Sequence, residues 1–226
     1  MTLHFLREME RMNDHLIEMG NQIEAQLNAA YQAVIQLDEA AARRVIRGDV
    51  EVDNNEILME EECLKLLALY QPVAGDLRLI VAALKINTDL ERIGDHAKNI
   101  AEAAIGLSAG SSIDIPESMN AIFKQARLML RKTLLAFVEA DRELAEQVLE
   151  MDDDVDNMCS AELPHQIELI KQHPENADQR LILLSVCRQL ERIGDHASNI
   201  AEDVVYLLSG DIIRHGENAA VLKTLG

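Results

Sequence analysis

Carboxylates recur along this chain in pairs whose spacing suits metal binding. Glu91 and Asp95 are four residues apart, and so are Glu191 and Asp195. In a helix this spacing places both side chains on one face, one turn apart, where their like charges repel by about 0.2–0.5 kcal/mol. Converging carboxylate oxygens are ligands for hard or borderline divalent and trivalent cations. The two pairs are therefore candidate metal-binding groups.

Two further pairs with the same spacing lie upstream, one before each of the first two. Adjacent antiparallel helices would bring an upstream and a downstream pair face to face across a helix–helix groove. The sequence thus predicts two clusters of metal ligands: Asp49, Asp53, Glu91 and Asp95 in the first, and Asp152, Asp156, Glu191 and Asp195 in the second. The alternative is that these stripes are only the solvated faces of acidic helices.

The downstream pairs belong to an internal repeat. Residues 90–102 read LERIGDHAKNIAE and residues 190–202 read LERIGDHASNIAE, so that 12 of 13 positions are identical at a separation of 100 residues. Upstream, Val52-Asp53-Asn54 recurs as Val155-Asp156-Asn157. Such self-similarity indicates a duplicated structural unit.

Two other residue types stand out within the repeated motif. His96 and His196 each follow the motif aspartate, and they are either ligands at the edge of a cluster or plain surface histidines. Gly94 and Gly194 lie in the middle of a helical pattern, where glycine costs about 1 kcal/mol relative to alanine. Their presence indicates that another helix passes close by, or that space is needed beside the carboxylates.

Apolar residues at steps of three and four predict long amphipathic helices. The first spans residues 6–37, and Gly48-Asp49 reads as a break and restart between a short helix and a long one. Asp76 is a candidate N-cap. The expected helices cover residues 6–37, 41–47, 49–70 and 76–107, and then 116–138, 141–149, 152–172 and 178–208.

These elements predict an all-α fold of two tandem, pseudo-symmetric three-helix bundles. The first bundle is expected to occupy residues 1–107 and the second residues 116–209. Residues 108–115, followed by Pro116, form a linker between them, and residues 210–226 form a C-terminal tail.

Composition restricts the partners and the compartment. The formal charge of -19 disfavours nucleic acids and anionic lipids as partners. The sequence has neither a signal-peptide pattern nor an apolar run of about 18 residues, so we expect a cytoplasmic protein that reaches a membrane only through its partners. Cys63, Cys159 and Cys187 form no CxxC motif, and we expect them to be reduced core thiols.

The repeated motifs, together with GDVEVDN, DDDVDN and QPVAGDLRLI, closely resemble the PhoU family over essentially the whole chain, to about residue 208. Members are cytoplasmic, usually homodimeric negative regulators of the phosphate-starvation response. The resemblance implies an adaptor between the ATPase of a phosphate ABC transporter and a membrane sensor histidine kinase. In some members the repeated E(D)xxxD motifs bind metal clusters of iron, zinc, manganese or magnesium, so the resemblance implies metal at both clusters here. Because the Arg180-to-Glu191 link is two residues shorter than the Arg78-to-Glu91 link, the second cluster departs more from the family pattern.

Two other functions compete with this interpretation. A metal-dependent phosphohydrolase could use paired carboxylates to hold two metal ions, but the sequence places no basic cluster or glycine-rich loop beside the acidic stripes. No Walker A, GxSxG or HExxH motif occurs, so we expect a protein that is not an enzyme. A purely structural helical scaffold is the other alternative.

Overall fold

The computed structural model describes residues 3–209, and it is built from helices throughout that range. Six long helices and one short 3-10 helix follow one another along the chain, and no strand occurs among these residues. The predicted all-α fold is confirmed. The helices are α1 (Leu3–Gln36), α2 (Glu39–Tyr70), α3 (Ala74–Ser108), α4 (Glu117–Glu139), α5 (Arg142–Gln172), η1 (Pro174–Asn176) and α6 (Ala177–Ser209).

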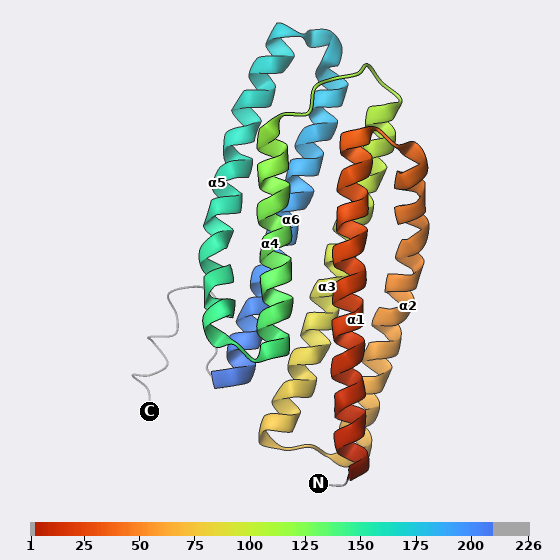
Figure 1. Cartoon of the computed structure of the whole chain (residues 1–226), viewed down its shortest axis with the longest axis vertical. Helices are drawn as coiled ribbons and strands as arrows, with labels where there is room; N and C mark the ends of the chain where they lie inside the picture. The colour runs from red at the N-terminus through yellow and green to blue at the C-terminus, as the bar shows by residue number, and fades with distance from the viewer. Residues whose placement is uncertain (1–2, 210–226) are drawn as a thin grey trace.

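Two antiparallel three-helix bundles lie side by side (Figure 1). Helices α1, α2 and α3 pack on one another in the first bundle, and α4, α5 and α6 do so in the second. The bundles meet chiefly where α3 packs against α6, with a smaller contact between α1 and α4. Helices α2 and α5 lie at the two outer edges (Figure 1). One continuous apolar core runs through both bundles.

The same turn connects the first two helices of each bundle. Leu37 and Ala140 end α1 and α4 in the left-handed conformation, with φ of 51° and 52°. The next residue, Asp38 or Asp141, then caps the following helix by accepting a hydrogen bond from the backbone N–H three residues on, at 2.9 and 3.0 Å. The duplication seen in the sequence therefore includes the turn between the first two helices of each bundle.

Three predicted helix boundaries were wrong. Helix α2 continues through Gly48, and α5 runs unbroken from Arg142 to Gln172. A single glycine costs only about 1 kcal/mol in a helix, and burial of neighbours such as Val45 and Val52 outweighs it. Val73 rather than Asp76 occupies the N-cap of α3. The predicted tail, residues 210–226, lies outside the described residues.

Two expectations from composition concern the cysteines and the membrane. Cys63, Cys159 and Cys187 are buried free thiols, as predicted for core cysteines. None of the helices in residues 3–209 is both long enough and apolar enough to cross a bilayer.

The motif glycines allow an outer helix to approach a central one. A Cβ atom on Gly94 would lie 3.2 Å from Val52 Cγ1 on α2, whereas a Cβ on Gly194 would meet its nearest neighbour, Asp152 Oδ1 on α5, at 3.5 Å. The close approach of another helix, one of the two reasons suggested for these glycines, is thus found at Gly94, whereas a Cβ at Gly194 would meet only ordinary contacts.

We expect Gly194→Ala to stabilise the protein by up to about 1 kcal/mol, because the methyl group would meet only ordinary contacts while the helix gains propensity. Gly94→Ala should gain less or lose stability, because Val52 must move. Urea unfolding of both variants measures the difference. A larger gain for Gly94→Ala would contradict the stated packing.

Candidate metal-binding carboxylate clusters

Helices α2 and α3 bring the four predicted residues of the first cluster together. Asp49 is 2% exposed. Burial raises the pKa of Asp53, and the negative charges of Asp49 and Asp95 add to the rise. Burial, followed by Asp95 and Asp53, likewise raises the pKa of Glu91. These effects place Asp53, Glu91 and Asp95 near one another across the α2–α3 groove, with Asp49 beside Asp53.

A lysine lies among the carboxylates of this first cluster. Lys98 Nζ is 2.6 Å from Asp49 Oδ2 and 3.7 Å from Asp95 Oδ1. Gln26 on α1 donates a hydrogen bond to the other oxygen, Asp49 Oδ1, at 3.1 Å. Both oxygens of the buried Asp49 therefore have partners. The hydrogen bond to Asp49 also raises the pKa of Lys98, which keeps its ammonium charged.

Sequence reasoning missed Lys98, Gln26 and a fifth carboxylate, Glu56. The negative charge of Glu56 contributes to the raised pKa of Glu91, and burial raises the pKa of Glu56 itself. A signal for Lys98 was present, because it is the one position at which the two thirteen-residue motifs differ. No local pattern pointed to Gln26, which arrives from another helix.

The second cluster assembles three of its four predicted residues closely. Burial raises the pKa of Asp152, as do the charges of Asp156 and Asp195, while the nearby Ser198 hydroxyl lowers it. Burial, then Asp195 and Asp153, raise the pKa of Asp156. Asp153 is thus an additional member that the sequence did not single out.

Glu191 and the basic residue of the motif lie at the margin of the second cluster. Glu191 acts electrostatically on Cys159 and lines a surface hollow of about 450 Å³ with Cys159 and Arg188. Arg192 Nη1 contacts Asp195 Oδ2 at 3.2 Å, but both side chains are well exposed. Such an exposed ion pair contributes little to stability.

The fit of these residues to a metal ion differs between the clusters. Within residues 3–209, no three His, Cys, Asp or Glu side chains stand close enough to hold an ion without rearranging. Asp95 and Asp195 are 50% and 36% exposed, so their carboxylates have room to rotate. In the second cluster, Asp152 Oδ1 is buried with no partner stronger than the neutral Ser198 hydroxyl, and a cation there would offset the carboxylate charge. In the first, Lys98 already supplies the positive charge.

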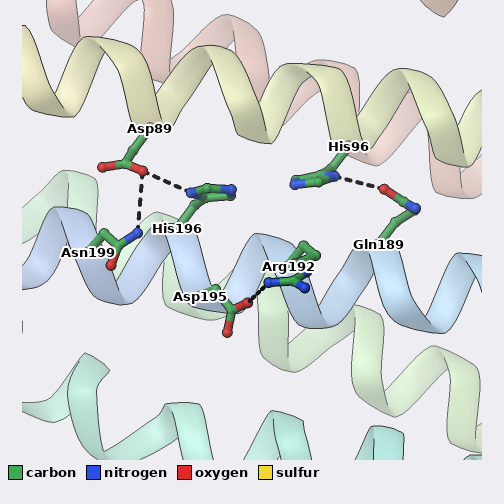
Figure 2. Close-up of polar contacts among 7 residues, drawn as sticks. All are labelled: Asp89, His96, Gln189, Arg192, Asp195, His196 and Asn199. Carbon is green, nitrogen blue, oxygen red and sulfur yellow. Dashed lines mark hydrogen bonds and ion pairs between the residues drawn. The ribbon is translucent and has the colours of Figure 1, made fainter. Parts of the chain in front are cut away.

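Neither expectation for the motif histidines was right, because both side chains face the other bundle. His96 and His196 stack with ring centroids 5.3 Å apart between α3 and α6. His96 Nδ1 lies 2.7 Å from Gln189 Oε1, and His196 Nδ1 lies 2.8 Å from Asp89 Oδ1 (Figure 2). Burial lowers the pKa of His96. The histidines therefore join the two repeats, on the side of α6 opposite Asp195 (Figure 2).

We expect Glu91→Gln to stabilise the metal-free protein near neutral pH and to flatten its pH dependence. The pKa of Glu91 is raised above its ordinary 4.5, so the folded state binds this proton more tightly than the unfolded state. The resulting stability is complete below the ordinary pKa and is lost as pH rises through the raised value. Urea unfolding in EDTA between about pH 4 and 7 measures the effect.

The matched control is Glu10→Gln, which removes the same charge from an exposed position on α1. It should not reproduce the flattening. Identical pH profiles for wild type and Glu91→Gln would contradict the clustering of carboxylates around Glu91.

Comparison with known proteins places this geometry in a family. The model of the PhoU domain matches residues 16–104 and again residues 119–204. Proteins named phosphate-specific transport system accessory protein PhoU homolog are similar throughout. The one from Pseudomonas putida is 39% identical over 212 residues, covering 93% of this chain and 83% of the relative. The one from Aquifex aeolicus is 36% identical over 218 residues, covering 94% and 96%.

Solved structures agree with the sequence comparison. The crystal structure of PhoU from Pseudomonas aeruginosa superposes with a TM-score of 0.88 at 38% identity, covering 91% of this chain and 99% of that one. The phosphate transport system regulatory protein PhoU from Streptococcus pneumoniae gives a TM-score of 0.87 at 27% identity, covering 93% and 100%. With both repeats matched and the full fold shared, the chain belongs to the PhoU family.

Proposed function

We propose that this protein is a negative regulator of phosphate uptake and of the phosphate-starvation response. It acts as a cytoplasmic, homodimeric adaptor between the ATPase of a phosphate ABC transporter and a membrane sensor histidine kinase. The observation that carries the proposal is the match of both repeats to accessory proteins of the phosphate-specific transport system. A shared fold alone would support much less, because function depends on sites rather than on architecture.

The carboxylate clusters give this adaptor a metal-dependent surface. Asp152, Asp156 and Asp195, with Glu191 at the margin, would hold a cation in the second repeat; Asp49, Asp53, Glu91 and Asp95 are the corresponding residues of the first. A bound cation would supply positive charge that offsets the burial and the mutual repulsion that raise the pKa values of these carboxyl groups. All donors are carboxylate oxygens, a set that suits magnesium, manganese or iron better than zinc.

We expect deletion of the gene to switch on a phosphate-starvation reporter in phosphate-rich medium, because the negative regulator is then missing. Complementation with the wild-type gene should restore repression, and reporter activity measures both. The transporter ATPase and the kinase should also co-purify with the tagged protein. A reporter that stays off in the deletion strain would contradict the regulatory role.

Metal binding is expected to stabilise the purified protein. Excess Mn²⁺ should raise its free energy of unfolding, by about 2.7 kcal/mol at a concentration one hundred times Kd, and EDTA should reverse the gain. Asp152→Asn/Asp156→Asn should reduce this gain, because the variant loses two of the three carboxylates that lie close together in the second cluster. Thermal unfolding with and without Mn²⁺ measures both effects.

The control Asp154→Asn neutralises an exposed carboxylate on the same helix, and it should keep the wild-type response. An equal Mn²⁺ response in all three proteins would contradict metal binding at the second cluster. The phosphohydrolase alternative is tested in the same samples, since release of phosphate from a generic phosphoester by the Mn²⁺-loaded protein would favour an enzyme.

A further inference from the structure

The two carboxylate clusters differ in the residue that lies between their acidic side chains. Lys98 in α3 corresponds to Ser198 in α6, and this is the one difference within the repeated motif. Lys98 reaches Asp49 Oδ2 at 2.6 Å. Ser198 offers only a short, neutral hydroxyl beside Asp152, the counterpart of Asp49.

A second difference between the clusters comes from α1 and α4, and it also leaves the second cluster with fewer partners for its carboxylates. Gln26 Oε1 and Met129 Sδ occupy corresponding places, each 3.7 Å from the Cβ position of its motif glycine. Gln26 donates a hydrogen bond to Asp49 Oδ1. A methionine thioether has no proton to donate, so Met129 cannot give Asp152 the hydrogen bond that Gln26 gives Asp49.

We propose that Lys98 serves as a built-in cation for the first cluster, so that this cluster does not take up metal and the second repeat alone binds it. This inference rests on the proposed metal binding and deepens it. The ammonium lies where a metal ion would have to bridge Asp49 and Asp95, and two cations cannot share that position without strong repulsion. Asp49 is ion-paired with Lys98 and accepts a hydrogen bond from Gln26, whereas Asp152 has the neutral Ser198 hydroxyl in the place of the lysine. The cluster that binds metal is thus the second one, although its sequence departs more from the family pattern.

The two repeats thereby perform different tasks. In the first cluster, Lys98 offsets part of the carboxylate charge between α2 and α3 at any metal concentration. In the second, between α5 and α6, Asp152 has no lysine in that place, and a bound metal ion would supply the missing positive charge. Any metal response of the protein therefore originates on the α5–α6 side, at the outer edge opposite α2 (Figure 1).

Exchanging the two residues between the repeats tests this inference. Wild type, Lys98→Ser, Ser198→Lys and the double exchange are purified without a metal-affinity tag, loaded with Mn²⁺ and desalted. Metal content per chain is then measured by mass spectrometry and affinity by calorimetry. Ser198→Lys should weaken Mn²⁺ binding at least ~10-fold, since even outer-sphere changes at metal sites cost 10–100-fold. Lys98→Ser should add binding at the first cluster, and the double exchange should bind metal there alone.

Matched variants separate the effect of charge from the effect of side-chain size. Ser198→Met adds bulk without charge and should weaken Mn²⁺ binding less than Ser198→Lys. Circular dichroism checks folding, and Ser198→Lys keeps the inference testable if Lys98→Ser, which leaves a buried Asp49 unpaired, fails to fold.

The failure of this inference is distinguishable from the failure of metal binding itself. Metal in the wild type that persists undiminished in Ser198→Lys and is lost in Glu91→Gln/Asp95→Asn would overturn the inference and leave metal binding standing. No Mn²⁺ in any variant would overturn both. Loss in Ser198→Lys with a gain in Lys98→Ser supports both.

Discussion

The antiparallel packing of α3 against α6 is the contact on which the rest of the architecture depends. Each of these helices packs against both helices of its own bundle as well as against its counterpart. Both are therefore buried over most of their circumference, and residues such as Ala97 and Ala197 are completely buried. What remains exposed on each is a narrow edge facing α2 or α5. Asp95 and Asp195 lie along that exposed edge, so both clusters form in the outer grooves.

Polar pairs set the register of this central contact. Asp89 on α3 contacts His196 on α6, and Gln189 on α6 contacts His96 on α3 (Figure 2). The two contacts involve equivalent positions of the two repeats. Lys85 adds an ion pair to Asp203 at 2.6 Å. Apolar packing alone would tolerate sliding of one helix past the other, whereas buried polar groups must find their partners in one register. The two bundles are consequently fixed relative to each other.

The duplicated bundles have kept their packing while their charges have diverged. Val52 and Val155 occupy the same place beside the motif glycines, and Asp38 and Asp141 cap the same turn. Core positions tolerate little change in volume. Positions at the groove edge are less constrained by packing, so one repeat carries Lys98 beside its carboxylates while the other carries Ser198 in the same place. Duplication thus supplied one scaffold with two differently charged grooves.

The sequence by itself determined the helical fold, the duplication and the carboxylate pairs, because hydrophobic period, repeated letters and i,i+4 spacing are local properties of the chain. It also predicted the close approach at Gly94. It misjudged Gly48, since local propensity is weak beside the burial of a whole helix face. Only the tertiary structure decided which neighbours reach each cluster. Gln26 comes from another helix, and the histidines turn toward the opposite repeat. Those outcomes depend on how helices distant in sequence pack together, which no local spacing encodes.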